Sequence, residues 1–384
     1  MDIPFHKPIF PKDLNSILKE STSSGWVTTG PKVKLFEKRL SEYLSAKYVI
    51  AVNSCTAALH LALASKGIGK GDKYIVPSYT FVATVEVGEY LGATPVLVDC
   101  SYDTFNIDLD KVEELLASDK RNEIKAILPV YFAGKPFDYK RLNLIAQKYN
   151  LFILEDAAHA LETISEINIK NTVALSFYAN KNITTGGEGG ALVTNNKTIA
   201  EKARKLSLHG MSKDGWKRFK VGAKWMYDIS DLGYKYNMTD ISASFGIDQL
   251  EKINIWRLRR IEIVKKYFTK LKDIDGIINP EFIIDESHSW HLYIIKIIGD
   301  KWKISRDEII NKLNQKGVGT SVHYIPIHMH SYYIKKYGYR SEDYPISKKL
   351  SESVITLPLY PRMKNRHIEY VINVLLDIWK KYKI

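Results

Sequence analysis

Short apolar runs rich in β-branched residues alternate with helical stretches between about residues 48 and 195. The helical stretch TAALHLALASKG follows the first of these runs, which are YVIAVN, YIVP, TPVLVD, AILPV, LFILED, TVALSF and ALVTNN. The run Ala126 to Val130 is apolar on both faces, as expected for a strand in a sheet that helices cover on both sides. The alternation predicts an α/β sandwich built on a largely parallel sheet.

Past Asn237 the period of the apolar positions changes. Within 261–271, residues Ile261, Val264, Phe268 and Leu271 recur at steps of three and four, which predicts a long helix with one buried stripe. The run HLYIIKII, a helix near SRDEIINKLNQKG, the segment TSVHYIPIH and a C-terminal helix follow. We therefore predict a large α/β domain over residues 1–250, and a long linking helix with a small C-terminal α+β domain over residues 251–384.

Composition narrows the class of protein. Hydrophobic residues make up 45% and charged residues 26%, the balance of a soluble globular chain. The start MDIPFHKPIFPKDL has no signal-peptide pattern, and no run of about 18 apolar residues occurs, so we expect a cytoplasmic protein that is not in a membrane. Cys55 and Cys100 are the only cysteines and lack metal-ligand spacing, so we expect free thiols and no metal site.

The net charge of +13 raises the question of a nucleic-acid partner. The lysines are scattered along the chain, and the densest cluster is Arg257, Arg259 and Arg260, in an amphipathic helical pattern. Such charges usually form a solvated helix face, so we expect no nucleic-acid partner. A phosphate-bearing small substrate would use the excess charge equally well.

Two motifs place a carboxylate and a lysine just beyond strand ends. Asp156 lies in LEDAAH, and Lys181 ends SFYANK, 25 residues later. Ligands of open α/β sheets bind at the carboxyl ends of the strands. A carboxylate there can keep a pyridine nitrogen protonated, and a lysine there can form an imine. Taken alone, Lys181 is better explained as a surface lysine on a glycine-rich turn.

Two further segments of the sequence favour a ligand-binding role for Lys181. The segment NSCTAA at residues 53–58 lies at a strand-to-helix junction, where free N–H groups and the helix dipole bind anions and Thr56 adds a hydroxyl. A simple helix N-cap is the alternative interpretation of this segment. The turn GGEGG at residues 186–190 allows the backbone to approach a ligand closely.

Together these motifs resemble the DegT/DnrJ/StrS family of sugar aminotransferases. Matching segments run in order from about Ser24 to Pro361 and include SGWVTTGPKVKLFE, NSCTAALHLAL, PSYTFVAT, GATPVLVD, DTFNID, EDAAHA, SFYANKNITTGGEGG, HGMSKDGWKRF, GYKYNMTDISA, SWHLYII and GTSVHYIPIH. The resemblance implies a fold-type I enzyme dependent on pyridoxal phosphate, with a large mostly parallel α/β/α domain and a smaller C-terminal α+β domain. It also implies a homodimer with shared active sites.

The resemblance assigns roles to single residues. It makes Lys181 the lysine that forms the Schiff base with the cofactor, and Asp156 the partner of the pyridine nitrogen. His159 matches a neighbour of the cofactor ring and its phenolic oxygen, with a core histidine bonded to backbone as the alternative. Phe81 matches the aromatic residue that stacks on the ring, with ordinary core filling as the alternative.

Further residues are expected to hold the phosphate and the substrate. The implied phosphate contacts are Ser176, Thr56, Cys55 through its backbone, and Asn237 from the other subunit. The expected substrate contacts are Thr28, Lys32, His323 and Tyr324. Two departures border this site: TTGGEGG is one glycine longer than the expected TTGEGG, and ALETISEINIKNTVALSF is shorter than the usual span.

The implied reaction moves an amino group from L-glutamate, which leaves as 2-oxoglutarate, to a nucleotide-linked keto sugar. Resemblance to the subgroup with SF-x-x-NK-x-ITTG favours a 4-keto-6-deoxyhexose, aminated for a surface polysaccharide or glycan. The nucleotide, UDP, GDP or dTDP, is left open by the sequence.

Other interpretations fit parts of the pattern. A 3-keto sugar aminotransferase of the same family differs in the carbon that is aminated. A non-catalytic sugar-nucleotide binder would tolerate loss of Lys181, and dehydratase relatives carry histidine in its place, so this lysine favours amine transfer. A dehydrogenase using NAD would need GxGxxG after the first strand, where NSCTAA stands instead.

Overall fold

The computed structural model describes residues 1–11, 13–23, 25–167, 169–211, 227–282 and 287–384. A seven-stranded sheet with the spatial order β1-β7-β6-β5-β4-β2-β3 forms its centre. Strands β2 to β6 are parallel, and β7 runs antiparallel to β6 and β1, so the predicted largely parallel sheet is confirmed. The strands are β1 (Tyr48–Val52), β2 (Lys73–Pro77), β3 (Thr94–Val98), β4 (Ile124–Ile127), β5 (Phe152–Asp156), β6 (Thr172–Ser176) and β7 (Gly190–Thr194).

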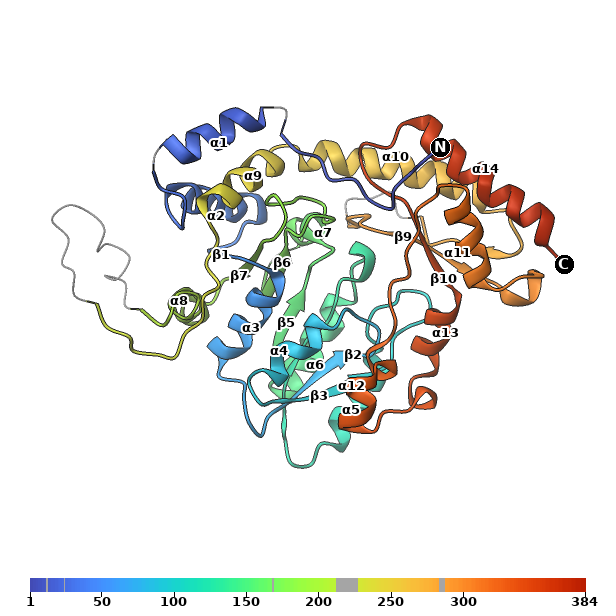
Figure 1. The fold of residues 1–384 in the computed structure, drawn as a ribbon. Helices are drawn as coiled ribbons and strands as arrows, with labels where there is room; N and C mark the ends of the chain where they lie inside the picture. The colour runs from blue at the N-terminus through green and yellow to red at the C-terminus, as the bar shows by residue number, and fades with distance from the viewer. Residues whose placement is uncertain (12, 24, 168, 212–226, 283–286) are drawn as a thin grey trace.

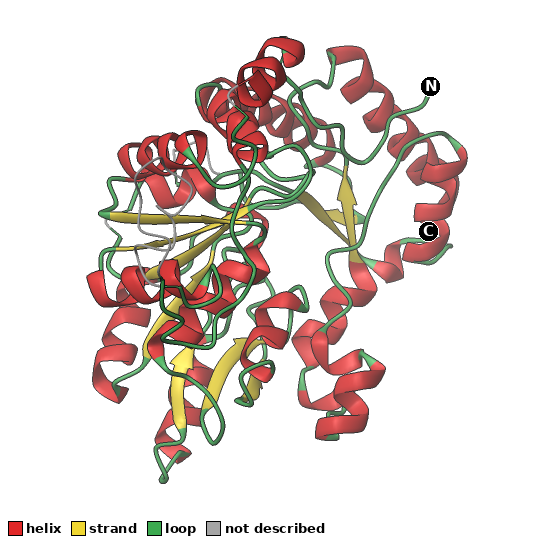
Figure 2. Ribbon diagram, turned by 60° about the vertical axis from the view of Figure 1, so that its left-hand side comes forward, coloured by secondary structure: helices red, strands yellow, loops and turns green. Residues whose placement is uncertain are grey.

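Helices cover both faces of this sheet (Figures 1 and 2). In β1, Ile50 and Val52 belong to one core, whereas Val49 and Ala51 belong to the core on the opposite face. Because successive side chains of a strand point to opposite faces, a strand between two apolar layers is apolar throughout. The covering helices are α2 (Pro31–Leu44), α3 (Cys55–Lys66), α4 (Ala83–Glu89), α5 (Leu109–Ser118), α6 (Tyr139–Tyr149), α7 (Leu161–Ser165), α8 (Lys197–Leu206) and α9 (Asp240–Leu250).

Strand β4 differs from its predicted extent. The apolar run predicts a strand from Ala126 to Val130, but β4 begins at Ile124 and ends at Ile127. Pro129 has no N–H to donate to the ladder, which accounts for the early end of the regular strand. The chain still follows β5, because Val130 forms an isolated parallel bridge with Asp156. This bridge keeps the loop after β4 beside the end of β5.

A smaller unit contains an antiparallel sheet with the order β10-β9-β8. The long helix lies against this sheet and buries Val264 and Leu271, as predicted, while Ile261 and Phe268 are half-buried. HLYIIKII contains the central strand, and TSVHYIPIH runs as a loop until its last two residues begin a short 3-10 helix at Ile327–Met329. The elements are α10 (Ile253–Leu271), β8 (Ile277–Ile278), β9 (Tyr293–Ile297), α11 (Arg306–Gln315), β10 (Val354–Leu357) and α14 (Asn365–Tyr382).

Contacts cross between the two units in both directions. Ile3 pairs with Val318 and lies in the core of the smaller unit, although the next helix, α1 (Leu14–Ser23), packs on α9 of the large unit. Ile327 and Tyr333 lie in the core of the large sheet. The division into residues 1–250 and 251–384 therefore stays a prediction. Among the described residues, the α-helices not yet given are α12 (Ser331–Tyr337) and α13 (Pro345–Ser353).

The arginine cluster of α10 is not a solvated face. Arg257 and Arg260 are buried, and they form ion pairs with Glu166 and Glu162, respectively. The expectation of a solvated face is wrong for these two residues, because the helix period predicts which face is buried but not that carboxylates from elsewhere in the chain line it. Within the described ranges, no helix is long and apolar enough to cross a bilayer, and no cluster of metal-ligating side chains occurs.

Candidate active site

Asp156 and Lys181 lie at neighbouring positions on the sheet. Asp156 ends β5, and Lys181 follows the turn after the adjacent parallel strand β6. The buried Asp156 carboxylate accepts hydrogen bonds from Thr84 Oγ1 (2.7 Å) and from the N–H of Ala158 (3.0 Å). Burial raises the pKa of Asp156, whereas these hydrogen bonds and the nearby Lys181 lower it. A cation placed against this carboxylate would favour its ionised form further.

The environment of Lys181 makes its amine a better nucleophile. Burial lowers the pKa of Lys181 to about 8, although Asp156 and Cys55 raise it. At pH 7 about a tenth of such an amine is neutral, against well under a thousandth for a free lysine. The arrangement therefore offers both a neutral amine and a fixed carboxylate at one edge of the sheet.

The start of α3 provides an anion site. The Ser54 hydroxyl caps the helix by accepting from the N–H of Ala57 at 3.0 Å, so the N-cap interpretation is confirmed for this residue. Among the described residues, the N–H groups of Cys55 and Thr56 have no hydrogen-bond partner. Both residues are half-buried. A helix start with free N–H groups can bind a phosphate. The Ser54 cap does not prevent this, because it uses the N–H of Ala57 and not those of Cys55 and Thr56.

The glycine turn contacts this helix start. A Cβ on Gly190 would lie 2.4 Å from the carbonyl carbon of Ser54 and 2.5 Å from the nitrogen of Cys55. Gly190 therefore permits strand β7 to pass directly against the start of α3. Ser176 is the partner of Gly190 in the β6–β7 ladder, which brings it close to Cys55. Gly187, by contrast, has open space at the Cβ position, so the longer turn imposes no close contact there.

His159 is held by a side chain from the smaller unit. Its Nε2 lies 3.2 Å from the hydroxyl of Tyr324, and its buried Nδ1 has no partner among the described residues. The ring makes no hydrogen bond to described backbone, which argues against the core-histidine alternative. Burial and the nearby Lys181 lower the pKa of His159 well below its usual value, so the ring is neutral. A buried ring nitrogen without a partner suits a polar group of a ligand.

Phe81 is not part of the core. The residue is 57% exposed, and its ring centroid lies 5.9 Å from that of Tyr324. The core-filling alternative is therefore wrong for Phe81. His323, next to Tyr324, is buried and hydrogen-bonded through Nδ1 to Thr356 Oγ1 at 2.9 Å.

Asn237, Thr28 and Lys32 lie together at the start of α2. The Asn237 amide donates to Thr29 Oγ1 at 2.8 Å, and its backbone pairs with Val52 at the end of β1. Thr28 is exposed, and the Lys32 ammonium pairs with Glu20. Within the described part of the chain, no hydrogen bond or ion pair links these residues to Lys181. Their roles toward cofactor and substrate stay predictions.

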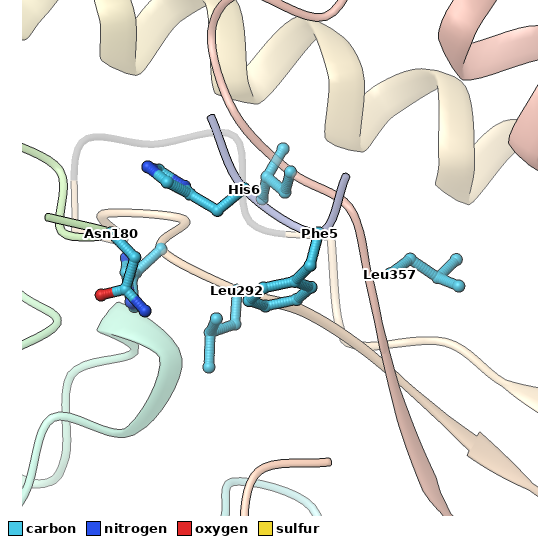
Figure 3. Close-up of a pocket in the computed structure, with 7 residues that line it drawn as sticks. Phe5, His6, Asn180, Leu292 and Leu357 are labelled. Atoms are coloured by element: carbon cyan, nitrogen blue, oxygen red, sulfur yellow. The ribbon is translucent and has the colours of Figure 1, made fainter. Parts of the chain in front are cut away.

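Residues without an assigned role also surround Lys181. Asn182, the next residue along the chain, shares a hydrogen bond of 2.9 Å with His291 Nδ1. The ring centroids of His291 and His159 are 4.3 Å apart. The motif SWHLYII contains His291, but nothing local in that motif indicates a role for it. His6 and Asn180 line a small cavity next to His291 (Figure 3). Residues 212–219 of HGMSKDGWKRF lie outside the described residues.

The residues present fit pyridoxal phosphate. Cys55 and Thr56 offer free N–H groups to a phosphate, and Asp156 offers a buried carboxylate to a pyridine nitrogen. His159 offers a partnerless ring nitrogen, and Lys181 offers an amine of lowered pKa. This combination of groups matches the cofactor's phosphate, ring nitrogen, phenolic oxygen and aldehyde.

Comparisons with known proteins agree with this chemistry. The model of the DegT/DnrJ/EryC1/StrS aminotransferase family matches residues 9–376. MJ1066, an uncharacterised protein of Methanocaldococcus jannaschii, is 42% identical over 381 residues, which are 98% of this chain and 97% of that protein. SpsC, a spore coat polysaccharide biosynthesis protein of Bacillus subtilis, is 41% identical over 383 residues, again 98% of this chain and 97% of that protein.

A solved structure shares the whole fold. Spr1654 of Streptococcus pneumoniae, assigned as a sugar aminotransferase, matches in its PMP form with a TM-score of 0.90 and 33% identity. The match covers 99% of this chain and 98% of that chain. Its PLP form matches with a TM-score of 0.88 and 32% identity, over 99% of each chain.

Proposed function

Because the chain belongs to the DegT/DnrJ/EryC1/StrS aminotransferase family, we propose that it moves an amino group from L-glutamate to a nucleotide-linked 4-keto-6-deoxyhexose. Family membership and the solved neighbours make it a sugar aminotransferase dependent on pyridoxal phosphate. The observation that carries the proposal is the position of Lys181, with a pKa of about 8, beside the buried carboxylate of Asp156 at adjacent strand ends.

The chain's own residues divide the work of binding and proton transfer. When bound, the cofactor supplies an electron sink for the carbanion formed as the donor loses its α-proton. Asp156 would hold the pyridine nitrogen, the start of α3 would hold the phosphate, and His159 would contact the phenolic oxygen. Lys181 Nζ would anchor the cofactor, and once released it would take up the α-proton and return it to a neighbouring carbon. Its lowered pKa supports this role, because the amine must be neutral to accept a proton.

The amino donor and the sugar are the finer part of the proposal. Support for a 4-keto-6-deoxyhexose comes from the subgroup motif SF-x-x-NK-x-ITTG around Lys181. Support for a role in surface polysaccharide synthesis comes from the likeness to SpsC. The net charge of +13 suits a substrate that carries a diphosphate. We also propose a cytoplasmic homodimer in which Asn237 reaches the partner's cofactor phosphate.

A coupled assay tests the substrate. The holoenzyme is supplied with L-glutamate and, separately, with the UDP-, GDP- and dTDP-linked 4-keto-6-deoxyhexoses, and 2-oxoglutarate is measured. We expect turnover with one nucleotide form and identification of the product as a 4-amino sugar. Faster turnover of the matched 3-keto sugar would overturn the proposed position of amination. Amination of an active sugar with another amino acid as donor, but not with L-glutamate, would overturn the proposed donor.

A further inference from the structure

We infer that His291 is a positioning residue, which Asn182 and Glu162 fix in one tautomer and which holds the ring of His159 in place. The role toward the reaction rests on the proposed function, since it concerns the orientation of His159 against the cofactor. The arrangement of Glu162, Asn182 and His291 does not rest on the proposed function.

The orientation of the Asn182 amide follows from its neighbours. Its Nδ2 lies 2.5 Å from Glu162 Oε2 and 3.4 Å from the carbonyl oxygen of Ser289. Glu162 is fully buried and paired with Arg260, which is always charged, so its carboxylate is an acceptor. The –NH₂ group of Asn182 must therefore face these two acceptors, and its Oδ1 must face His291.

The tautomer of His291 follows from that orientation. Asn182 Oδ1 lies 2.9 Å from His291 Nδ1 and can only accept, so Nδ1 carries the proton. His159, Lys181, His323 and His6 surround the ring, and burial together with these groups lowers the pKa of His291 well below its usual value. A neutral ring protonated on Nδ1 has a bare Nε2, and it cannot flip without losing the bond to Asn182.

The fixed ring of His291 constrains His159. The two ring centroids are 4.3 Å apart, and the ring planes are tilted by 33°. Tyr324 bonds His159 Nε2 at 3.2 Å, so the ring is held by a bond at one nitrogen and by packing on one face. The nitrogen left without a described partner is Nδ1. His291 thereby keeps this nitrogen aimed in a single direction, toward the site that we assign to the cofactor's phenolic oxygen.

Nuclear magnetic resonance on ¹⁵N-histidine-labelled apoenzyme tests the tautomer without any turnover. The His291 signal is assigned by its loss in His291→Phe. We expect the neutral tautomer protonated on Nδ1 at pH 7, and a mixture of tautomers in Asn182→Ala. The matched control is Asn180→Ala, which removes an amide from the same turn that makes no described bond to His291. The control should leave the His291 signal unchanged. A His291 ring that is protonated on Nε2, or doubly protonated at pH 7, would overturn the inference.

Two substitutions separate positioning from ordinary packing. His291→Phe keeps an aromatic ring but loses the donor to Asn182, and His291→Asn keeps a donor near the place of Nδ1 but loses the ring. We expect the His159 signals of the apoenzyme to shift and broaden in both variants, because the ring would sample more than one orientation. In the holoenzyme, kcat should fall between about 10-fold and 100-fold with a smaller change in KM.

The outcomes distinguish this inference from the proposed function. An unchanged His159 signal and unchanged kcat in both variants, with only a lowered thermal midpoint, would show that His291 is structural and would overturn the inference. A wild-type enzyme that is inactive with every sugar tested would overturn the proposed function, whereas the tautomer of His291 in the apoenzyme would still be decided.

Discussion

The hydroxyl of Tyr324 lies 3.2 Å from Nε2 of His159, although 165 residues separate the two along the chain. Tyr324 belongs to the loop TSVHYIPIH, and His159 follows the end of β5 in the large sheet. One wall of the candidate site is therefore made where the two units meet. The orientation of the His159 side chain therefore depends on how the two units pack against each other.

Tyr324→Phe should lower kcat by roughly 10-fold, because it removes the partner of His159 Nε2 and leaves a buried polar atom unsatisfied. Steady-state kinetics with the preferred sugar measures this. Tyr370→Phe is the matched control, since it removes a hydroxyl that bonds the carbonyl of Lys316 on an exposed surface. Equal kinetics for the two variants would contradict a role for the Tyr324 hydroxyl.

Lys181→Ala should abolish turnover, with a loss of at least about 1,000-fold, while the fold remains intact. The measurement is twofold: circular dichroism for folding, and borohydride reduction of the native enzyme followed by peptide mapping. We expect the reduced cofactor on the peptide that carries Lys181. Lys197→Ala, at an exposed position on α8, serves as the control. A label on any other lysine would rule out the assignment.

Asp156→Asn should retain the cofactor but lose about 100-fold or more in kcat. The amide is nearly isosteric and can still accept from Thr84, but it carries no charge to stabilise a protonated pyridine nitrogen. Cofactor content, measured by absorbance of the purified protein, should be close to that of the wild type. Near-normal turnover would show that the carboxylate is structural.

Recombination of the apoenzyme with pyridoxal phosphate should depend on pH through Lys181. Its pKa is lowered to about 8, so the neutral amine increases about tenfold per pH unit below pH 8 and levels off above it. The rate constant for recombination should follow the same curve. Because Asp156 raises the pKa of Lys181, Asp156→Asn should move the plateau to lower pH. A rate that keeps rising to about pH 10 would indicate an ordinary lysine.

The free energy of unfolding of the apoprotein should also depend on pH through Lys181. The direction of this dependence follows from the lowered pKa of Lys181 in the folded state. The unfolded state binds a proton at Lys181 up to about pH 10.4, whereas the folded state releases it near pH 8. Between these values the unfolded state holds more protons, so this group makes folding more favourable as pH rises. Urea unfolding of the apoenzyme at pH 8 and pH 10, compared with Lys181→Ala, isolates this contribution.

Mixed dimers test the expected role of Asn237. Combining inactive Lys181→Ala chains with chains inactivated by Asn237→Ala should restore part of the activity. In the mixed dimer, one site would contain native Lys181 and native Asn237 from different chains. A tagged pull-down confirms that subunits exchange. Mixed dimers without recovered activity would place Asn237 in its own subunit's site, beside Val52, or outside any site.

Local pattern was sufficient for the positions of Asp156 and Lys181. Both follow apolar strands whose extent is encoded by neighbouring residues, and parallel strands bring their carboxyl ends to one edge of the sheet. The buried stripe of α10 was predictable for the same reason, because the helix period depends only on nearby residues. The sequence by itself thus determined the largely parallel sheet, its edge and the positions of the two groups to which we assign the chemistry.

Only the tertiary structure decided which side chains from distant parts of the chain pair with one another near the site. Glu162 and Arg260 are 98 residues apart, and Asn182 and His291 are 109 residues apart. No periodicity encodes such pairs, because a buried charge or a histidine tautomer depends on which partner the packing of distant elements brings within hydrogen-bond distance. The local pattern predicted a solvated face for Arg260, and only the assembled fold supplies the Glu162 carboxylate that makes its burial tolerable.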